Sequence, residues 1–334
     1  MTLSDPTSSE ALDKKMFDEV YRDTLAMLSD GSVNRHFDPF LDIAWDSPEF
    51  EIDQNDPRWV LSPDLDPLAA TDWYRNLPLE KQIEVGKWRT ANVIKVGSAF
   101  ESILIRGMMQ YIFTLPNGAP EYRYCMHEMT EECNHIQMFQ ELVNRIGVDV
   151  PGMRPLFRAM SPFIGVAGGY AYVILFMGIL GGEEPIDHYQ KALIRAGGDI
   201  PPAVLRTMEI HIAEEARHIS FAHEFLRVHL DRMGRFNRGV CSIAFPVAMR
   251  WLAGEIMTPP PVFAEKFDVP REVMKEAFWS SEHAQSILRG YFGDMRKLAH
   301  ELELMNPIAK RVWRFLGVGG APSRYRSEPE RSAA

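Results

Sequence analysis

Cysteine is scarce in this sequence and basic residues are outnumbered by acidic ones, and each observation disfavours a class of protein. The chain has 334 residues but only three cysteines, Cys125, Cys133 and Cys241. They are too few for a disulfide framework and lack the C-x-x-C spacing of zinc and redox sites. The 46 acidic residues outnumber the 36 Lys and Arg residues, for a net charge of −10. This balance disfavours nucleic acid as a partner, because phosphate backbones are bound by clustered cations.

A targeting signal is also missing from the given sequence. The N-terminal stretch MTLSDPTSSEALDKK has neither the basic region nor the apolar region of a signal peptide. With so few cysteines, this predicts a reducing, cytoplasmic setting.

One long apolar run raises the alternative of a membrane protein. Residues 163–182, FIGVAGGYAYVILFMGILGG, contain no charge and reach the length of a membrane span. The run is rich in glycine, an acidic EEPID follows its last glycines, and no second run of this quality exists. We therefore expect a central helix buried in a helical core, since an all-round apolar helix suits either environment. A membrane desaturase would need several spans and clusters of paired histidines.

The remaining pattern is helical almost throughout and predicts an all-α protein. Residues 12–30 have helical spacing, and residues 36–80, rich in Asp, Pro and Trp, predict an irregular wrap over the domain. We expect a single domain over residues 1–317 and a flexible tail over 318–334, which is rich in Gly, Ser, Pro and charge. The further helices are expected near 79–113, 120–147, 161–196, 201–232, 237–256, 271–283 and 285–302.

Two of these helices repeat the pattern Glu-x-x-His. Glu132 precedes His135, and Glu215 precedes His218. Residues three apart share a helix face, with Cβ atoms roughly 5–6 Å apart, so each pair can present a carboxylate and an imidazole to one point. Four-helix proteins that bind two iron or manganese ions use two such helices, with one further Glu from each of two other helices.

The preceding helices supply the two further carboxylates that this arrangement needs. Glu101 lies 31 residues before Glu132, while Glu183 and Glu184 lie 32 and 31 residues before Glu215. Each interval fits one helix, a turn and a return along the next helix. The chain therefore predicts two helical hairpins, within residues 79–232, that together hold two metal ions.

Several neighbouring residues extend this predicted site. His211 is on the same face as Glu215 and His218, so we expect a third imidazole ligand. Glu131 and Glu214 point about 100° away from the ligands on an ideal helix. They are expected either to contact the ligands without binding metal or to be solvated acids. Glu128 and Asp187 are further candidates for residues that contact the ligands, with Asp187 accepting a hydrogen bond from a ring N–H of a ligand histidine. A mixed oxygen and nitrogen set suits iron or manganese better than a closed zinc site.

With these residues assembled, the chain resembles the p-aminobenzoate N-oxygenase family of ferritin-like di-iron enzymes. That family carries a lone Glu, E-x-x-H, a second lone Glu and then H-x-x-x-E-x-x-H, and HIAEEARH supplies the last element here. The resemblance covers roughly residues 80–300. It maps the ligands Glu101, Glu132, His135, His211, Glu215 and His218. For the second lone Glu, the surrounding motif favours Glu183, whereas equal hairpin spacing favours Glu184. We select Glu183, because loop lengths vary more readily than motifs.

The resemblance implies a ferritin-like four-helix bundle and a reaction that uses two iron ions and O2. The iron pair would bind O2 as a peroxo species and oxidise an amine to a hydroxylamine and towards a nitro group. Electrons would come from an external donor, a ferredoxin with its reductase or an equivalent. An arginine would bind a substrate carboxylate, with Arg289 and Arg296 as the candidates.

Other functions stay open at this point. The same site also suits hydroxylation, desaturation or another oxidation at carbon, and the sequence does not separate these from N-oxygenation. A non-enzymatic ferritin-like iron protein is disfavoured by the extra histidine and by the long additional segments. We expect a small-molecule substrate, a homodimer, and neither a membrane nor a nucleic-acid partner.

Overall fold

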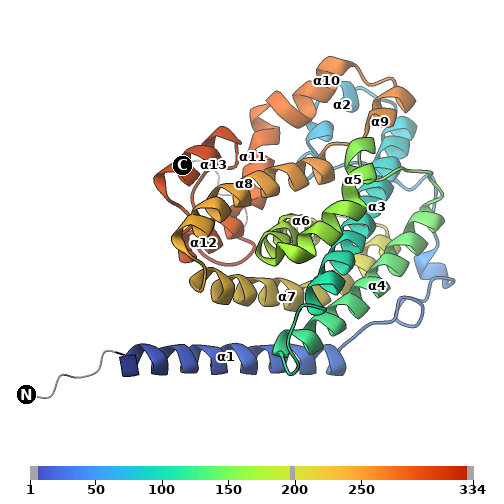
Figure 1. Cartoon of the computed structure of the whole chain (residues 1–334). Coiled ribbons are helices and arrows are strands. Elements are labelled where there is room, and N and C mark those ends of the chain that lie inside the picture. The colour runs from blue at the N-terminus through green and yellow to red at the C-terminus, as the bar shows by residue number, and fades with distance from the viewer. Residues whose placement is uncertain (1–6, 196–199, 329–334) are drawn as a thin grey trace, which may run out of the picture.

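A computed structural model describes residues 7–195 and 200–328, with side chains described from residue 18 onward. Within these residues every regular element is a helix, which confirms the predicted all-α class. The long helices are α1 (Thr7–Asn34), α3 (Leu79–Ile112), α4 (Pro120–Ile146), α5 (Pro155–Tyr170), α6 (Tyr172–Arg195), α7 (Pro202–Asp231) and α8 (Arg235–Met257). In Figure 1 the helices that follow α7 lie above it, and α1 lies below it.

Two hairpins form the ferritin-like bundle. Helix α3 packs on α4 and α6 packs on α7, while α3 also contacts α6 and α4 contacts α7. Helix α1 lies outside this bundle, against α4 and α7 (Figure 1). Proline begins α4 and α7, where its missing N–H costs nothing, and Gly147 ends α4 with φ of 74°. Because of these local signals, the predicted ends of α3, α4 and α7 lie within one residue of the observed ends.

The glycine-rich apolar run does not form one buried helix, so that expectation was wrong. Ala171 has φ −108° and ψ 53° and separates α5 from α6. One face of α5 lies so close to α3 that a Cβ on Gly165 would be 2.8 Å from the carbonyl oxygen of Ile103. The opposite face is open to solvent, with Phe163 76% and Tyr170 69% exposed. The α6 part is largely buried, as predicted.

A different segment satisfies the length and composition of a membrane span. The stretch Arg235–Lys266, which contains α8, does so at a mean hydropathy of 1.3, and half of its apolar window is buried inside the protein. Residues 163–182 are not among the candidate spans of the described chain.

The segment between α1 and α3 wraps over the bundle as expected. It contains short 3-10 turns at Pro48–Phe50, Pro57–Trp59 and Pro67–Ala70, and one turn of helix, α2, at Asp72–Arg75. Trp59 is 3% exposed and Tyr74 2%. The wrap approaches α3 so closely that a Cβ on Gly86 would lie 1.7 Å from the carbonyl oxygen of Trp59. Only glycine fits at this position without a shift of the backbone.

The C-terminal part adds more helices than the sequence predicted. The expected helix at 271–283 is α10 (Arg271–Lys275) followed by a π-helical turn (Glu276–Ser280), and the expected helix at 285–302 is α11 (Glu282–Tyr291) and α12 (Gly293–Glu301). Two short helices, α9 (Pro261–Lys266) and α13 (Pro307–Phe315), were not predicted.

The beginning of the expected flexible tail is packed instead. Val318 is fully buried, and the guanidinium group of Arg296 donates hydrogen bonds to the carbonyl oxygens of Val318 (3.0 Å) and Ala321 (2.8 Å). These bonds hold the start of the segment against α12. Residues 329–334 of the expected tail lie outside the described residues.

Candidate metal centre

Ligand-type atoms from all four bundle helices meet at two neighbouring points inside the bundle. In each group the carboxylate oxygens and ring nitrogens lie within 4.8 Å of one another, and every residue is buried. The first group consists of Glu101 from α3, His135 from α4, and His211 and Glu215 from α7. The second consists of Glu128 and Glu132 from α4, Glu183 from α6 and His218 from α7.

Two carboxylates connect the groups. Glu132 lies between both histidines, with Oε2 3.0 Å from His135 Nδ1 and Oε1 2.8 Å from His218 Nδ1. Glu215 Oε1 lies 3.3 Å from His218 Nδ1 and 3.6 Å from His135 Nδ1. Glu132 and Glu215 are the residues of the two Glu-x-x-His pairs, so the repeat in the sequence becomes an approximate symmetry of the site.

The chemistry of the unsatisfied atoms fits a metal pair. Both carboxylate oxygens of Glu128, both of Glu183 and one of Glu215 are buried without a hydrogen-bond partner among the described residues. Burying such groups unpaired costs several kcal/mol each, and native proteins rarely tolerate it. Cations bound between the two groups would satisfy these oxygens and offset their charge.

The histidines of the two Glu-x-x-His pairs are held in place by carboxylates from the opposite helix. His218 on α7 has its Nε2 2.7 Å from Glu131 Oε2 on α4. His135 on α4 has its Nε2 2.9 Å from Glu214 Oε2 on α7. With Nε2–H donating to a carboxylate, Nδ1 is the nitrogen that remains free to bind a metal ion. Glu131 and Glu214 are therefore buried partners of the histidines, one of the two roles that the sequence allowed them.

The third histidine is oriented the other way. His211 Nδ1 lies 3.0 Å from the side-chain oxygen of Gln190 on α6. Its Nε2 faces Glu101 Oε1 at 3.5 Å and Glu215 Oε1 at 3.4 Å. No motif in the sequence marks Gln190.

The electrostatics of the carboxylates reflect a crowded, buried cluster of like charge. Burial raises the pKa of Glu101 well above its ordinary value, and the neighbouring carboxylate of Glu132 adds to the rise. Burial likewise raises the pKa of Glu128 and of Glu183. Burial alone would also raise the pKa of Glu132, but attraction to His218 and His135 outweighs it and lowers that pKa.

The three histidines divide into two types. Burial alone would lower the pKa of His135, but the carboxylate of Glu132 outweighs it and raises the pKa to about 10. Against the same effect of burial, Glu215 and Glu132 raise the pKa of His218. Burial lowers the pKa of His211 to about 4. Attraction to Glu215 does not outweigh burial here, and repulsion from His135 adds to the lowering.

Comparison with known proteins gives this geometry its context. The family described as P-aminobenzoate N-oxygenase AurF matches residues 18–303, which is most of the chain. The chain belongs to the AurF family. AurF-family proteins are di-iron oxygenases, so this chain is assigned to the oxidoreductases at that level.

Relatives of the chain add no activity of their own. An uncharacterized protein of Mycobacterium bovis and one of Mycobacterium tuberculosis strain H37Rv are each 55% identical over 314 residues, covering 94% of this chain and 92% of the relative. No solved structure is a significant match.

The structure separates the two candidates for the second lone glutamate of the AurF pattern. Glu183 lies in the second ligand group. Glu184 points elsewhere and accepts a hydrogen bond from His223 Nε2 at 2.8 Å. Glu128 is an eighth residue with ligand geometry, beyond the seven of the AurF pattern. Its position four residues before Glu132, on the same helix face, was the available signal.

Three weaker expectations do not agree with the structure. Asp187 does not face a ligand histidine, because its carboxylate accepts a hydrogen bond from Lys191 Nζ at 2.6 Å. Arg289 pairs with Glu282 at 2.5 Å. Arg296 is buried and donates to backbone carbonyl oxygens of the C-terminal segment. Both arginines line a separate cavity beside residues 319–323 and not the cavity at the ligand groups.

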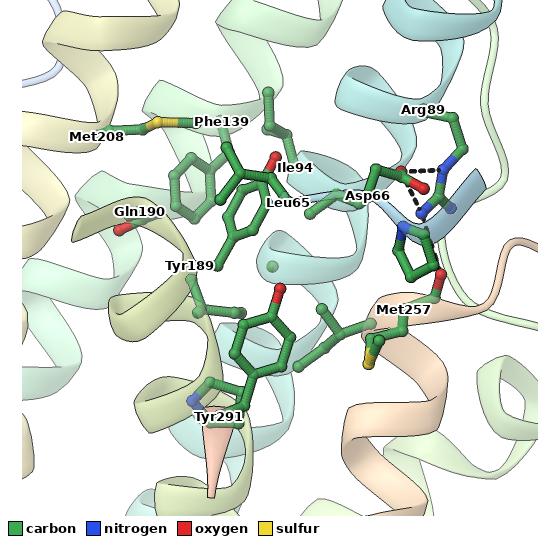
Figure 2. Close-up of a pocket in the computed structure, with 16 residues that line it drawn as sticks. Leu65, Asp66, Arg89, Ile94, Phe139, Tyr189, Gln190, Met208, Met257 and Tyr291 are labelled. Carbon is green, nitrogen blue, oxygen red and sulfur yellow. Dashed lines mark hydrogen bonds and ion pairs between the residues drawn. The ribbon is translucent and has the colours of Figure 1, made fainter. Parts of the chain in front are cut away.

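Two cavities lie near the ligand groups. The larger has a volume of about 390 Å³, and Glu101, Glu183 and His211 form part of its wall. The smaller, about 70 Å³, contains none of the eight ligand-type residues and is shown in Figure 2. In it, Asp66 pairs with Arg89 at 2.7 Å, and the Arg89 guanidinium also donates to the carbonyl oxygen of Met257 at 3.0 Å.

Proposed function

We propose that this chain is a di-iron, O2-dependent N-oxygenase that converts a primary amine, such as an arylamine, to a hydroxylamine and further towards a nitro compound. The observation that carries the proposal is the pair of buried four-residue groups, joined by Glu132 and Glu215 and open to a cavity. Membership of the AurF family supports the amine as the oxidised group.

We propose eight ligands for the two ions. They are the residues of the two groups, Glu101, Glu128, Glu132, His135, Glu183, His211, Glu215 and His218. When bound, the iron pair would activate O2 for transfer of one oxygen atom to nitrogen. Manganese would fit the same oxygen and nitrogen donors.

The protein's own groups have separate tasks in this proposal. Glu131 and Glu214 keep the rings of His218 and His135 in the tautomer that presents Nδ1. The buried wall around Glu183 excludes water from the reacting amine. The first oxidation consumes one amine, one O2, two electrons and two protons and yields a hydroxylamine and water. The two electrons come from a ferredoxin with its reductase, or an equivalent donor.

The same site would also support oxidation at carbon, since nothing in the ligand set is specific for nitrogen. Product analysis separates the two functions. Chain loaded with ferrous iron, given a chemical reductant and O2, should convert an arylamine to its hydroxylamine and nitro products. Exclusive hydroxylation of ring or side-chain carbon would contradict the proposal and favour the alternative.

The remaining features are predictions that follow from the same proposal. A cytoplasmic setting would keep the free cysteines reduced, of which Cys125 and Cys241 are buried and Cys133 is exposed. A homodimer is expected, and light scattering of the purified chain would measure its mass. A monomer would contradict that prediction and leave the proposed chemistry intact.

A further inference from the structure

We infer that the substrate is an uncharged, apolar amine whose only polar group is the amino group at the iron site, and not an amino acid or aminobenzoate that carries a carboxylate. This inference rests on the proposed N-oxygenation and names the substrate class for it. It comes from the wall of the larger cavity, which is the one that reaches the ligand groups.

The polar side chains in the wall of this cavity gather at one end, with the indole N–H of Trp251 at the entrance as the exception. Glu101, Glu183 and His211 mark the end at the proposed iron ions. Apart from the indole N–H of Trp251, the other lining side chains carry no polar atom, and none of the described lining residues is Lys or Arg. The cavity therefore offers a substrate one reactive polar end and an apolar remainder.

A carboxylate would be poorly accommodated in this cavity. An ionised group moved from water into an apolar wall without a partner loses its hydration and gains nothing in return. The two arginines that could have neutralised it, Arg289 and Arg296, are engaged elsewhere and line a different cavity.

The size and entrance of the cavity agree with this assignment. Its volume of about 390 Å³ falls within the roughly 300–1,000 Å³ typical of small-molecule sites. The smaller cavity of Figure 2, with its Arg89–Asp66 pair, has only about 70 Å³ and no candidate ligand in its wall. The exposed lining residues of the larger cavity are Ala167, Ala171 and Trp251, so it reaches the surface between α5 and α8.

Both helices expose an apolar side chain within four residues of the entrance residues Ala171 and Trp251. Tyr170 on α5 is 69% exposed, and Val247 on α8 is 47% exposed. An apolar amine would meet a largely apolar wall between the entrance and the ligand groups.

Two probes of matched size test the inference, 4-butylaniline and 4-(4-aminophenyl)butanoate. Their dissociation constants would be measured by equilibrium dialysis against the iron-loaded, reduced chain without O2, so that no turnover occurs. We expect the neutral probe to bind about tenfold tighter or more, because burial of an unpaired carboxylate opposes binding. Equal or tighter binding of the carboxylated probe would overturn the inference.

Two variants locate the binding in the cavity. A Cβ on Gly178 would meet only the side chain of Leu252, at 3.9 Å, so Gly178→Leu should fill the cavity and abolish binding of 4-butylaniline. Gly239→Leu, on α8 where a Cβ meets nothing within 4 Å, is the matched control and should bind normally. Ala248→Arg places a cation in the wall and should improve binding of the carboxylated probe. Unchanged binding of 4-butylaniline by Gly178→Leu would contradict the assignment.

Products formed after O2 is admitted keep the two proposals distinct. If 4-butylaniline binds tightly but is oxidised only at carbon, the substrate class stands and N-oxygenation fails. If 4-(4-aminophenyl)butanoate binds more tightly and is converted to the nitro compound, N-oxygenation stands and the substrate class fails.

Discussion

The hydrogen bonds between the ligand histidines and the opposite helix allow a quantitative prediction. Glu131 is 3% exposed and receives a bond from His218 Nε2 at 2.7 Å and one from Arg217 Nη2 at 2.8 Å. Glu131→Gln keeps the size of the side chain but removes its charge. Hydrogen bonds to charged groups contribute about 1.5–3 kcal/mol, and those between neutral groups about 0.5–1.5 kcal/mol.

The difference of about 1–2 kcal/mol corresponds to about 5- to 30-fold weaker metal binding. This overlaps the roughly 10- to 100-fold losses usual for hydrogen-bond partners of metal ligands. Glu131 contacts the second group only, through His218, so Glu131→Gln should weaken the binding of the ion at that group. Glu214→Gln should weaken the other ion through His135, and the double variant should weaken both.

The assay is a competition titration of ferrous iron against a chelator without O2, with metal per chain counted at each step. Glu224→Gln is a matched control, because Glu224 is also on α7 but forms a surface pair with Arg227 and its side chain is 30% exposed. Full iron loading with unchanged affinity in both Glu131→Gln and Glu214→Gln would refute the reasoning.

Three further predictions address the ligands, the wrap and the pH dependence. Glu128→Gln should weaken iron binding at the second group. Its control is Glu209→Gln, which should not, because Glu209 is a half-exposed acid on α7 that pairs with Arg206. Equal iron affinity in the two variants would remove Glu128 from the ligand set. Gly86→Ala should lower the free energy of unfolding by about 1–3 kcal/mol or more in a denaturant titration, whereas Gly239→Ala should be neutral or stabilising. In the metal-free protein the pKa of His135 is raised from the ordinary 6.5 to about 10. Protonated His135 therefore contributes to the free energy of unfolding, and this contribution is fully present below about pH 6.5 and is lost as the pH rises through about 10. Iron must displace that proton, so iron affinity should rise by up to about tenfold per pH unit near neutral pH; a flat profile would contradict the protonation state.

Local signals made part of the fold predictable from the sequence. Helix α3 was expected at 79–113 and runs from Leu79 to Ile112, because Pro, Gly and Asn residues mark the ends of the hairpin helices. The break at Ala171 was missed because α5 and α6 share one continuous apolar run. Before the break, Gly165 and Gly169 pack closely on α3, a long-range contact that no local pattern reports.

The candidate site was predictable to the extent that it lies on single helix faces. The spacing within α4 and α7 places each Glu-x-x-His pair on one side of its helix, and that side is buried. The pairing of Glu131 with His218 and of Glu214 with His135 depends on how α4 and α7 are rotated toward each other. The arginine prediction failed for the same reason, since residue type alone does not say which cavity a side chain lines.

The most direct test of the central claim is the number of iron ions bound per chain after loading with ferrous iron, measured together with the ligand variant His218→Ala. The two buried groups predict two iron ions in the native chain and a loss of iron in the variant. A native chain that binds no iron, or a single zinc ion in its place, would contradict the di-iron centre and every function proposed from it.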